Sequence, residues 1–160
     1  MFREMRRNRQ QLSREAAENV LKRCTSGVLA VSGDEDYPYA VPLSYFYEDG
    51  KLWFHCAKTG HKIDSIRRNE KVSFCVIEQD QIVPEKFTTY FRSVIVFGRA
   101  RIMEDEEAKI LAVTKLADKY SPHMEAARDK EIADFLSQLC MVEIEIEHIT
   151  GKEAIELVNK

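Results

Sequence analysis

Residues 54–66 read FHCAKTGHKIDSI. Their first positions continue an alternation of apolar and other residues that begins at Leu52, and this period of two indicates a strand. The small residues Thr59-Gly60 then open a helix. Ile63 and Ile66 are spaced as on one face of a short helix over residues 61–69. The central expectation for this chain is therefore a strand that turns directly into a helix.

His61 and Lys62 fall in the first turn of that expected helix. Free backbone N–H groups and the positive end of the helix dipole make a helix N-terminus an anion site. Cations at the same place are disfavoured by up to about 1 kcal/mol. Two basic side chains here therefore indicate a compensating anion, although on this segment alone two solvated surface residues are an equal alternative.

Strand patterns recur along the rest of the chain. Alternating apolar residues predict six strands, at residues 28–32, 39–48, 51–56, 72–76, 90–103 and 140–147. Asp49-Gly50 is a strong hairpin signal between the second and third of them. The polar stretch over residues 79–88 contains Pro84 and predicts a loop.

Helices are expected at four places. Ser13 is a suitable N-cap for the first, which ends near Thr25, and the second covers residues 61–69. Asp105 caps a third helix that runs through Tyr120, and a fourth piece extends to about Ser137. Hairpins outnumber βαβ units, so we expect a mostly β, α+β chain: an antiparallel barrel of six strands with helices packed outside.

Residues 38–44 read PYAVPLS and form the second notable segment. Pro42 lacks a backbone donor, so regular pairing lapses there or the strand lies at an edge of the sheet. Backbone groups beside it are then free to bond a flat heterocycle. An ordinary edge strand is the alternative.

Composition limits the classes of function. The chain has 160 residues, of which 44% are hydrophobic and 32% charged, and its net charge is −3. We expect a basic, solvated arm over residues 1–11 and a single domain over residues 12–160. The acidic balance argues against nucleic-acid binding. We expect no membrane span, because no apolar run approaches about 18–20 residues, and no secretory signal.

The cysteines and histidines suggest neither bridges nor metal. Cys24, Cys56, Cys75 and Cys140 lie in apolar patterns without Cys-x-x-Cys spacing, which indicates free thiols in a reduced, cytoplasmic protein. His123 and His148 have no partner at the spacing of metal ligands, so no zinc or iron site is expected.

Four segments together resemble the pyridoxamine 5′-phosphate oxidase-like FMN-binding split barrels, and within them the 5-nitroimidazole-resistance branch. They are PYAVPLSY (38–45), LWFHCAKTGHKIDSI (52–66), YFRSVIVFGRARI (90–102) and ITGKEA (149–154). Each is moderately specific, but their order and spacing match the family over nearly the whole chain from about Leu12. The resemblance implies a split β-barrel that binds FMN as a homodimer, with the flavin shared between subunits.

The resemblance also implies which residues hold the cofactor. His61 and Lys62 match the pair that grips the FMN phosphate, and Cys56 and Ala57 match the turn that lines the phosphate and ribityl chain. The strand along the isoalloxazine ring corresponds to Val41, Pro42, Leu43 and Ser44. Two further pairs match segments that reach the flavin near the dimer interface, the second from the other subunit: Arg92 with Ser93, and Gly151 with Lys152. His55, one strand position before the turn, faces either the core or the cofactor.

Two departures bear on the expected activity. His61 replaces an arginine of the wider family, which makes the charge at the phosphate dependent on pH. Trp53 is the only tryptophan, so the C-terminal Trp and Arg signature of true pyridoxamine-phosphate oxidases is absent and vitamin B6 oxidation is not expected. The resemblance implies an FMN-dependent oxidoreductase that reduces a small, nitroaromatic-like electron acceptor. Alternatives are a non-catalytic flavin store or sensor, and a barrel without cofactor that serves as an interaction module.

Overall fold

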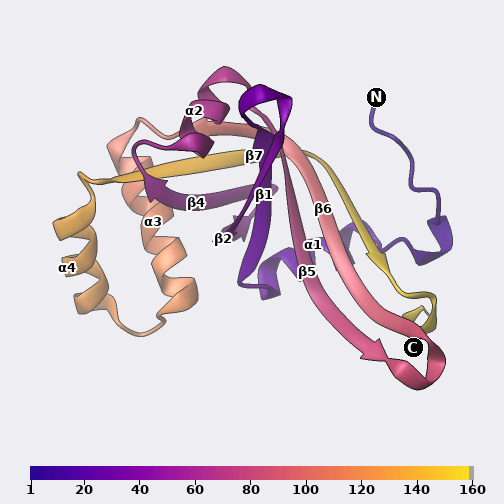
Figure 1. Ribbon diagram of the computed structural model, residues 1–160. Coiled ribbons are helices and arrows are strands. Elements are labelled where there is room, and N and C mark those ends of the chain that lie inside the picture. The colour runs from indigo at the N-terminus through magenta and orange to yellow at the C-terminus, as the bar shows by residue number, and fades with distance from the viewer. Residues whose placement is uncertain (159–160) are drawn as a thin grey trace.

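The computed structural model describes residues 1–158 and contains one antiparallel sheet in the strand order β2-β1-β5-β6-β7-β4-β3 (Figure 1). The bounds are Ser26–Ser32 (β1), Pro38–Ser44 (β2), Phe46–Glu48 (β3), Lys51–Ala57 (β4), Lys71–Val83 (β5), Thr88–Ile102 (β6) and Leu139–Glu153 (β7). The helices are Arg14–Arg23 (α1), His61–Arg68 (α2), Glu106–Tyr120 (α3) and Glu125–Phe135 (α4). The expectation of a mostly β, antiparallel α+β split barrel with helices outside is confirmed.

The number of strands is a correction, because this sheet has seven strands and not six. The expected strand over residues 39–48 is divided at Tyr45 into β2 and β3, which lie at opposite edges of the sheet. The Tyr45 N–H donates to the hydroxyl of Tyr120 at 2.9 Å, and the buried Tyr45 hydroxyl donates to the Leu21 carbonyl at 2.6 Å. Tyr45 thus bonds to two helices instead of a neighbouring strand, and the two edges of the sheet meet there.

Side-chain caps begin two of the helices, and a tight turn joins β3 to β4, as the sequence predicts. The Ser13 hydroxyl accepts the Ala16 N–H at the start of α1, and the Asp105 carboxylate accepts the Ala108 N–H at the start of α3. Asp49 and Gly50 both have positive φ, at 48° and 77°, between β3 and β4. This is the backbone that the hairpin signal requires.

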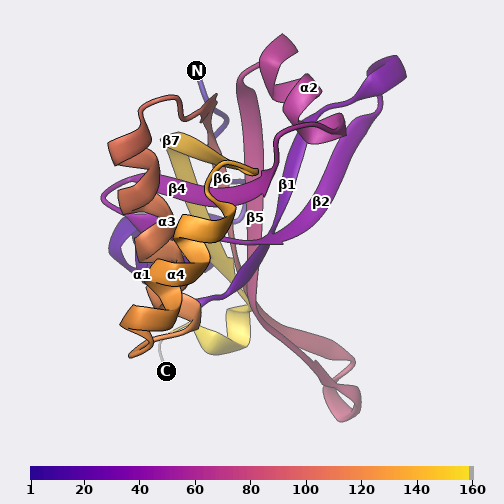
Figure 2. The same cartoon turned by 90° about the vertical axis from the view of Figure 1, so that its left-hand side faces the viewer.

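Two apolar clusters stabilise the arrangement. The main one fills the barrel beneath α1 and includes Tyr45, Phe54 and Phe74. The second joins α3 to the sheet through Leu116 and Met141. Figure 2 shows α3 and α4 side by side over the part of the sheet that carries β4 and β7. One end of the barrel is therefore covered by a helical hairpin.

The β5–β6 hairpin is longer than the sequence indicates. The prediction of a loop over residues 79–88 is wrong, since β5 continues to Val83 and pairs with β6 as far as the Val83–Thr88 position. Pro84 begins a short 3-10 turn at the tip. The hairpin extends away from the rest of the sheet in both views (Figures 1 and 2). Polar residues on a two-stranded ribbon can face water on both sides, which conceals the strand pattern.

The N-terminal arm lies against the sheet. Its arginines are exposed, but the Phe2 ring stacks on His148 at 4.6 Å and Leu12 donates its N–H to the Gly151 carbonyl at 2.9 Å. The following residues form the barrel as far as 158, while positions 159–160 of the expected domain lie outside the described residues. Within residues 1–158, none of the helices combines the length and apolar character needed to cross a membrane.

Candidate functional site

A pocket of about 440 Å³ opens where the barrel is split between β2 and β4. β3 pairs with β4 only from Lys51 to Trp53, so the end of β4 faces the free edge of β2 without a strand between them. The pocket brings together Val41, Pro42, Leu43, His55, Cys56, Ala57 and Lys62. These are seven of the residues that the sequence places at the cofactor. Segments far apart in the chain thus converge on one cavity.

The start of α2 supplies the positive end of this pocket. Gly60 is the N-cap, with φ at 134°, a backbone conformation that favours glycine, and no side chain caps the helix. The N–H groups of the first turn lack partners within the helix, and Lys62 on this turn lines the pocket. Amide donors, a helix dipole and an ammonium group therefore coincide, which is the donor set that a phosphate monoester requires.

His61 lies outside the pocket lining. Its Nε2 accepts the backbone N–H of Asp34 at 3.2 Å, and its ring lies 4.1 Å from that of Tyr39. The structure thus directs Lys62 toward the pocket and the imidazole toward the β1–β2 turn. The basic pair that the sequence places at the phosphate is separated in this structure.

His55 stands between this pocket and a second one of about 620 Å³. The second pocket lies between the α3–α4 hairpin and the sheet, is mainly apolar, and also includes Ser44 and Tyr120. His55, Phe135 and Leu139 line both cavities, so the two cavities are adjacent. Burial lowers the pKa of His55, so its imidazole is neutral near pH 7.

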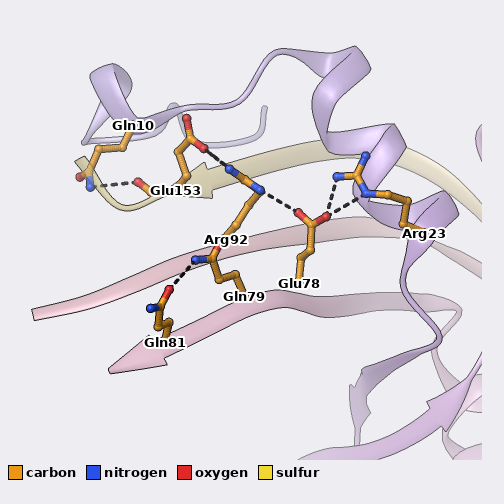
Figure 3. Close-up of polar contacts among 7 residues, drawn as sticks. All are labelled: Gln10, Arg23, Glu78, Gln79, Gln81, Arg92 and Glu153. Atoms are coloured by element: carbon orange, nitrogen blue, oxygen red, sulfur yellow. Dashed lines mark hydrogen bonds and ion pairs between the residues drawn. The ribbon is translucent and has the colours of Figure 1, made fainter. Parts of the chain in front are cut away.

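Arg92 is engaged within its own chain (Figure 3). Its guanidinium contacts the Glu153 carboxylate at 2.9 Å and that of Glu78 at 3.3 Å. Glu78 also binds Arg23 of α1 at 2.6 Å. In β6, Arg92 lies on the same side as buried Val94, whereas Ser93 lies on the opposite, outer side. The expected Arg92-Ser93 pair is therefore divided between two faces of the sheet.

Gly151 and Lys152 lie on β7, opposite Val94 and Ser93 respectively. A Cβ atom on Gly151 would come within 2.7 Å of the Leu12 side chain, so glycine allows Leu12, which follows the N-terminal arm, to pack against the sheet here. Lys152 lies on the outer side and places its Nζ 5.3 Å from the centre of the Phe91 ring. Neither residue lines the pocket at the split.

Comparison with known proteins agrees with this geometry. Residues 13–153 match the family model described as pyridoxamine 5′-phosphate oxidase. The chain belongs to the pyridoxamine 5′-phosphate oxidase family. The family that the sequence resembles is therefore confirmed. None of the curated proteins matches this family member.

Solved structures share the fold of this pyridoxamine 5′-phosphate oxidase family chain. A conserved hypothetical protein from Mycobacterium tuberculosis has a TM-score of 0.81 at 19% identity, over 94% of this chain and 90% of that one. A protein assigned to 5-nitroimidazole antibiotic resistance in Bacteroides thetaiotaomicron has a TM-score of 0.74 at 20% identity, over 89% of this chain and 86% of that one. An FAD-binding protein from Mesorhizobium loti has a TM-score of 0.66 at 28% identity, over 91% of this chain and 97% of that one.

A single row of side chains on the outer face of this family member connects the two groups of expected site residues. The row contains one residue from each of five neighbouring strands, each directly opposite the next: Pro42, Val28, Cys75, Ile95 and Thr150. Adjacent strands lie about 4.8 Å apart, so Pro42 and Thr150 are separated by roughly 20 Å along the sheet. Lys152 and Ser93 lie two positions further along their strands, so they are remote from the pocket of their own chain.

Sequence reasoning missed the contribution of the α4–β7 connection in this family member. Phe135, Gln138 and Leu139 also line the pocket at the split. α4 carries no buried residues, and its apolar side chains are spread around the helix. No periodic signal was therefore available to place this helix beside a ligand site.

Proposed function

We propose that this protein binds FMN in the pocket at the split, as a homodimer that shares each flavin between subunits, and acts as an oxidoreductase. The observation that carries the proposal is the convergence of β2, the end of β4 and Lys62 on one cavity. The combined volume of this pocket and its neighbour suits a small organic cofactor and a substrate. Free thiols at all four cysteines agree with a cytoplasmic location.

The residues of the pocket fit the parts of FMN. Lys62 and the first amides of α2 would bind the phosphate. Val41 and Leu43 offer an apolar wall, and the free edge of β2 offers backbone groups for the polar rim of a flat ring. FMN ends at this phosphate, whereas FAD continues beyond it. Identification of the nucleotide released on heating distinguishes the two.

The outer sheet face supports the shared site. Val28, Ile77 and Ile95 are apolar and exposed there, Ile77 by 62% of its surface, and such a patch favours a protein partner. A two-fold axis through the patch would exchange its ends, because a symmetric interface uses the same surface on both copies. Ser93 and Lys152 of one subunit would then approach Pro42 and the pocket of the other.

The reaction proposed is reduction of a small, nitroaromatic-like acceptor. A bound flavin supplies the electron transfer, and the protein supplies position and electrostatics. The second pocket adjoins the ring site through His55, and its apolar walls from α3 and α4 exclude water from an acceptor. Neutral His55 presents one donor and one acceptor nitrogen where the two cavities meet. It is the side chain best placed to orient a polar substituent of the acceptor.

The test compares Lys62→Ala with Arg67→Ala, which removes the same charge from the exposed side of α2. Loss of a charge-assisted contact of about 1.5–3 kcal/mol should lower FMN affinity roughly ten- to a hundredfold for Lys62→Ala. Arg67→Ala should remain within about twofold of the wild type, because its charge faces solvent. Equal FMN affinities for the two variants would show that the phosphate binds elsewhere.

Turnover separates the enzyme from a flavin store or sensor. Oxidation of a reduced pyridine nucleotide by the FMN-loaded protein in the presence of a nitroaromatic compound would establish the enzyme. Tight FMN binding without turnover over a broad set of acceptors would favour the store or sensor. A protein that takes up no FMN at all would favour an interaction module.

A further inference from the structure

Two cysteines face each other across the strands beside the candidate pocket. Cys56 on β4 and Cys140 on β7 are direct partners in the antiparallel register. The other two cysteines lack such a partner: Cys75 lies opposite Val28 and Ile95, and Cys24 follows α1. Within residues 1–158, Cys56 and Cys140 are therefore the one cysteine pair in strand register.

The geometry of this pair suits a disulfide. Directly opposite residues of antiparallel strands have Cα atoms about 4.5 or 5.5 Å apart and point to the same face. Both values fall within the roughly 4.4–6.8 Å that disulfides span. The two side chains lie close enough for Cys140 to raise the pKa of Cys56, and both pack on the main apolar cluster. Closing the bond thus requires rotation of side chains and little movement of the backbone.

The two thiols differ in access. Cys140 is buried, whereas Cys56 is half-buried and lines the pocket at the split. An oxidant that enters the pocket therefore meets Cys56 first, and Cys140 is positioned behind it as the second thiol. Lys62 lies near enough for its charge to favour the Cys56 thiolate.

We propose that Cys56 and Cys140 form a reversible disulfide, a redox modification site in the wall of the flavin pocket. The reaction with a small disulfide such as oxidised glutathione is balanced. The Cys56 thiolate attacks one glutathione sulfur and releases one glutathione thiolate. The Cys140 sulfur then loses its proton, attacks the Cys56 sulfur and releases the second glutathione. Two protein thiols are oxidised, and one disulfide is reduced to two thiols.

The pair responds slowly to oxidants. Burial raises the pKa of the Cys56 thiol to about 11, with a further rise from Cys140 and an opposing effect of Lys62. Compared with an ordinary cysteine, this lowers the thiolate fraction at neutral pH. The two thiols should therefore form a disulfide only when exposure to the oxidant is prolonged. Once closed, the bond directs the Cys56 sulfur away from the pocket and toward the buried Cys140.

The test uses the folded full-length protein with oxidised glutathione at about pH 8.5, near the ordinary pKa of a cysteine. Intact mass should show the loss of two hydrogens, and peptide mapping should show a Cys56–Cys140 link that dithiothreitol reverses. A variant with Cys24→Ser and Cys75→Ser should form the same link. Adding Cys56→Ser to that variant should abolish it and leave buried Cys140 mostly unmodified.

One result would overturn the proposed disulfide. It is a folded protein that remains reduced, or carries only glutathione adducts, under conditions in which the urea-unfolded chain forms the Cys56–Cys140 link. A second arm rests on the proposed FMN site, since saturating FMN should slow formation of the link at least about tenfold by covering Cys56. Equal rates with and without FMN would show that the flavin does not bind beside Cys56. The proposal that the two thiols form a disulfide would still stand.

Discussion

Replacing Ile77 with aspartate tests whether the outer sheet face completes the proposed flavin site. Ile77 is 62% exposed and stands directly opposite Ser93, whose other neighbour in register is Lys152. Complete burial of an isoleucine contributes about 1.5–3 kcal/mol, so covering the exposed part would contribute roughly 1–2 kcal/mol in each subunit. In a symmetric dimer the substitution occurs twice, and the apolar loss alone is roughly 2–4 kcal/mol.

The expected effect is correspondingly large. A loss of roughly 2–4 kcal/mol raises the dimer dissociation constant about 30- to 1000-fold, and burial of two carboxylates adds to it. Sedimentation equilibrium over a range of protein concentrations measures this constant, and flavin fluorescence measures FMN affinity in the same samples. Ile77→Asp should give a monomer that binds FMN weakly even when Lys62 is intact.

Leu111→Asp is the matched control, because Leu111 is 58% exposed but lies on α3, away from this face. It should leave both the dimer and FMN affinity unchanged. A folded Ile77→Asp monomer with the FMN affinity of the wild type would refute the shared site. An unaltered dimer would place the interface elsewhere on the molecule.

Two further predictions concern stability. Tyr45→Phe should lower the free energy of unfolding in urea by about 1–3 kcal/mol, because the buried Leu21 carbonyl loses its 2.6 Å donor. Tyr37→Phe, at an exposed position, should have little effect. Equal losses of stability in the two variants would contradict the role of the Tyr45 bond. Because burial lowers the pKa of His55, the unfolded chain binds more protons than the folded one just below about pH 6.5, and stability should fall as the pH drops through that range. His55→Gln should reduce this slope in urea titrations at several pH values.

Features governed by neighbours in the sequence were predictable. The Ser13 and Asp105 caps and the Asp49-Gly50 turn depend on contacts within a few residues, and each lies where expected. The pocket-lining residues on β2 and β4 were also identified, but from the family resemblance and not from periodicity. Their convergence was not visible in the sequence, because it depends on the register of strands far apart in the chain.

What the sequence could not show are interactions at long range. The division of one expected strand at Tyr45 depends on bonds to Leu21 and Tyr120, which are 24 and 75 positions away. The orientation of His61 depends on Asp34 in another turn. The long β5–β6 hairpin is stabilised by the pairing of its two strands, which needs no regular alternation of apolar and polar residues.

The strand break at Tyr45 also determines where a ligand can bind. If residues 39–48 formed one continuous strand, β2 and β3 would lie in line at the same edge of the sheet. The chain would then not connect the two edges. Because the chain crosses at Tyr45, the barrel is closed at that end, where β3 covers the beginning of β4. Within residues 1–158, no strand fills the space between β4 and β2 beyond Trp53. Lys62, on the first turn of α2, lines the pocket there. The same tyrosine that stabilises the fold therefore creates the opening in which a phosphate-bearing cofactor is expected.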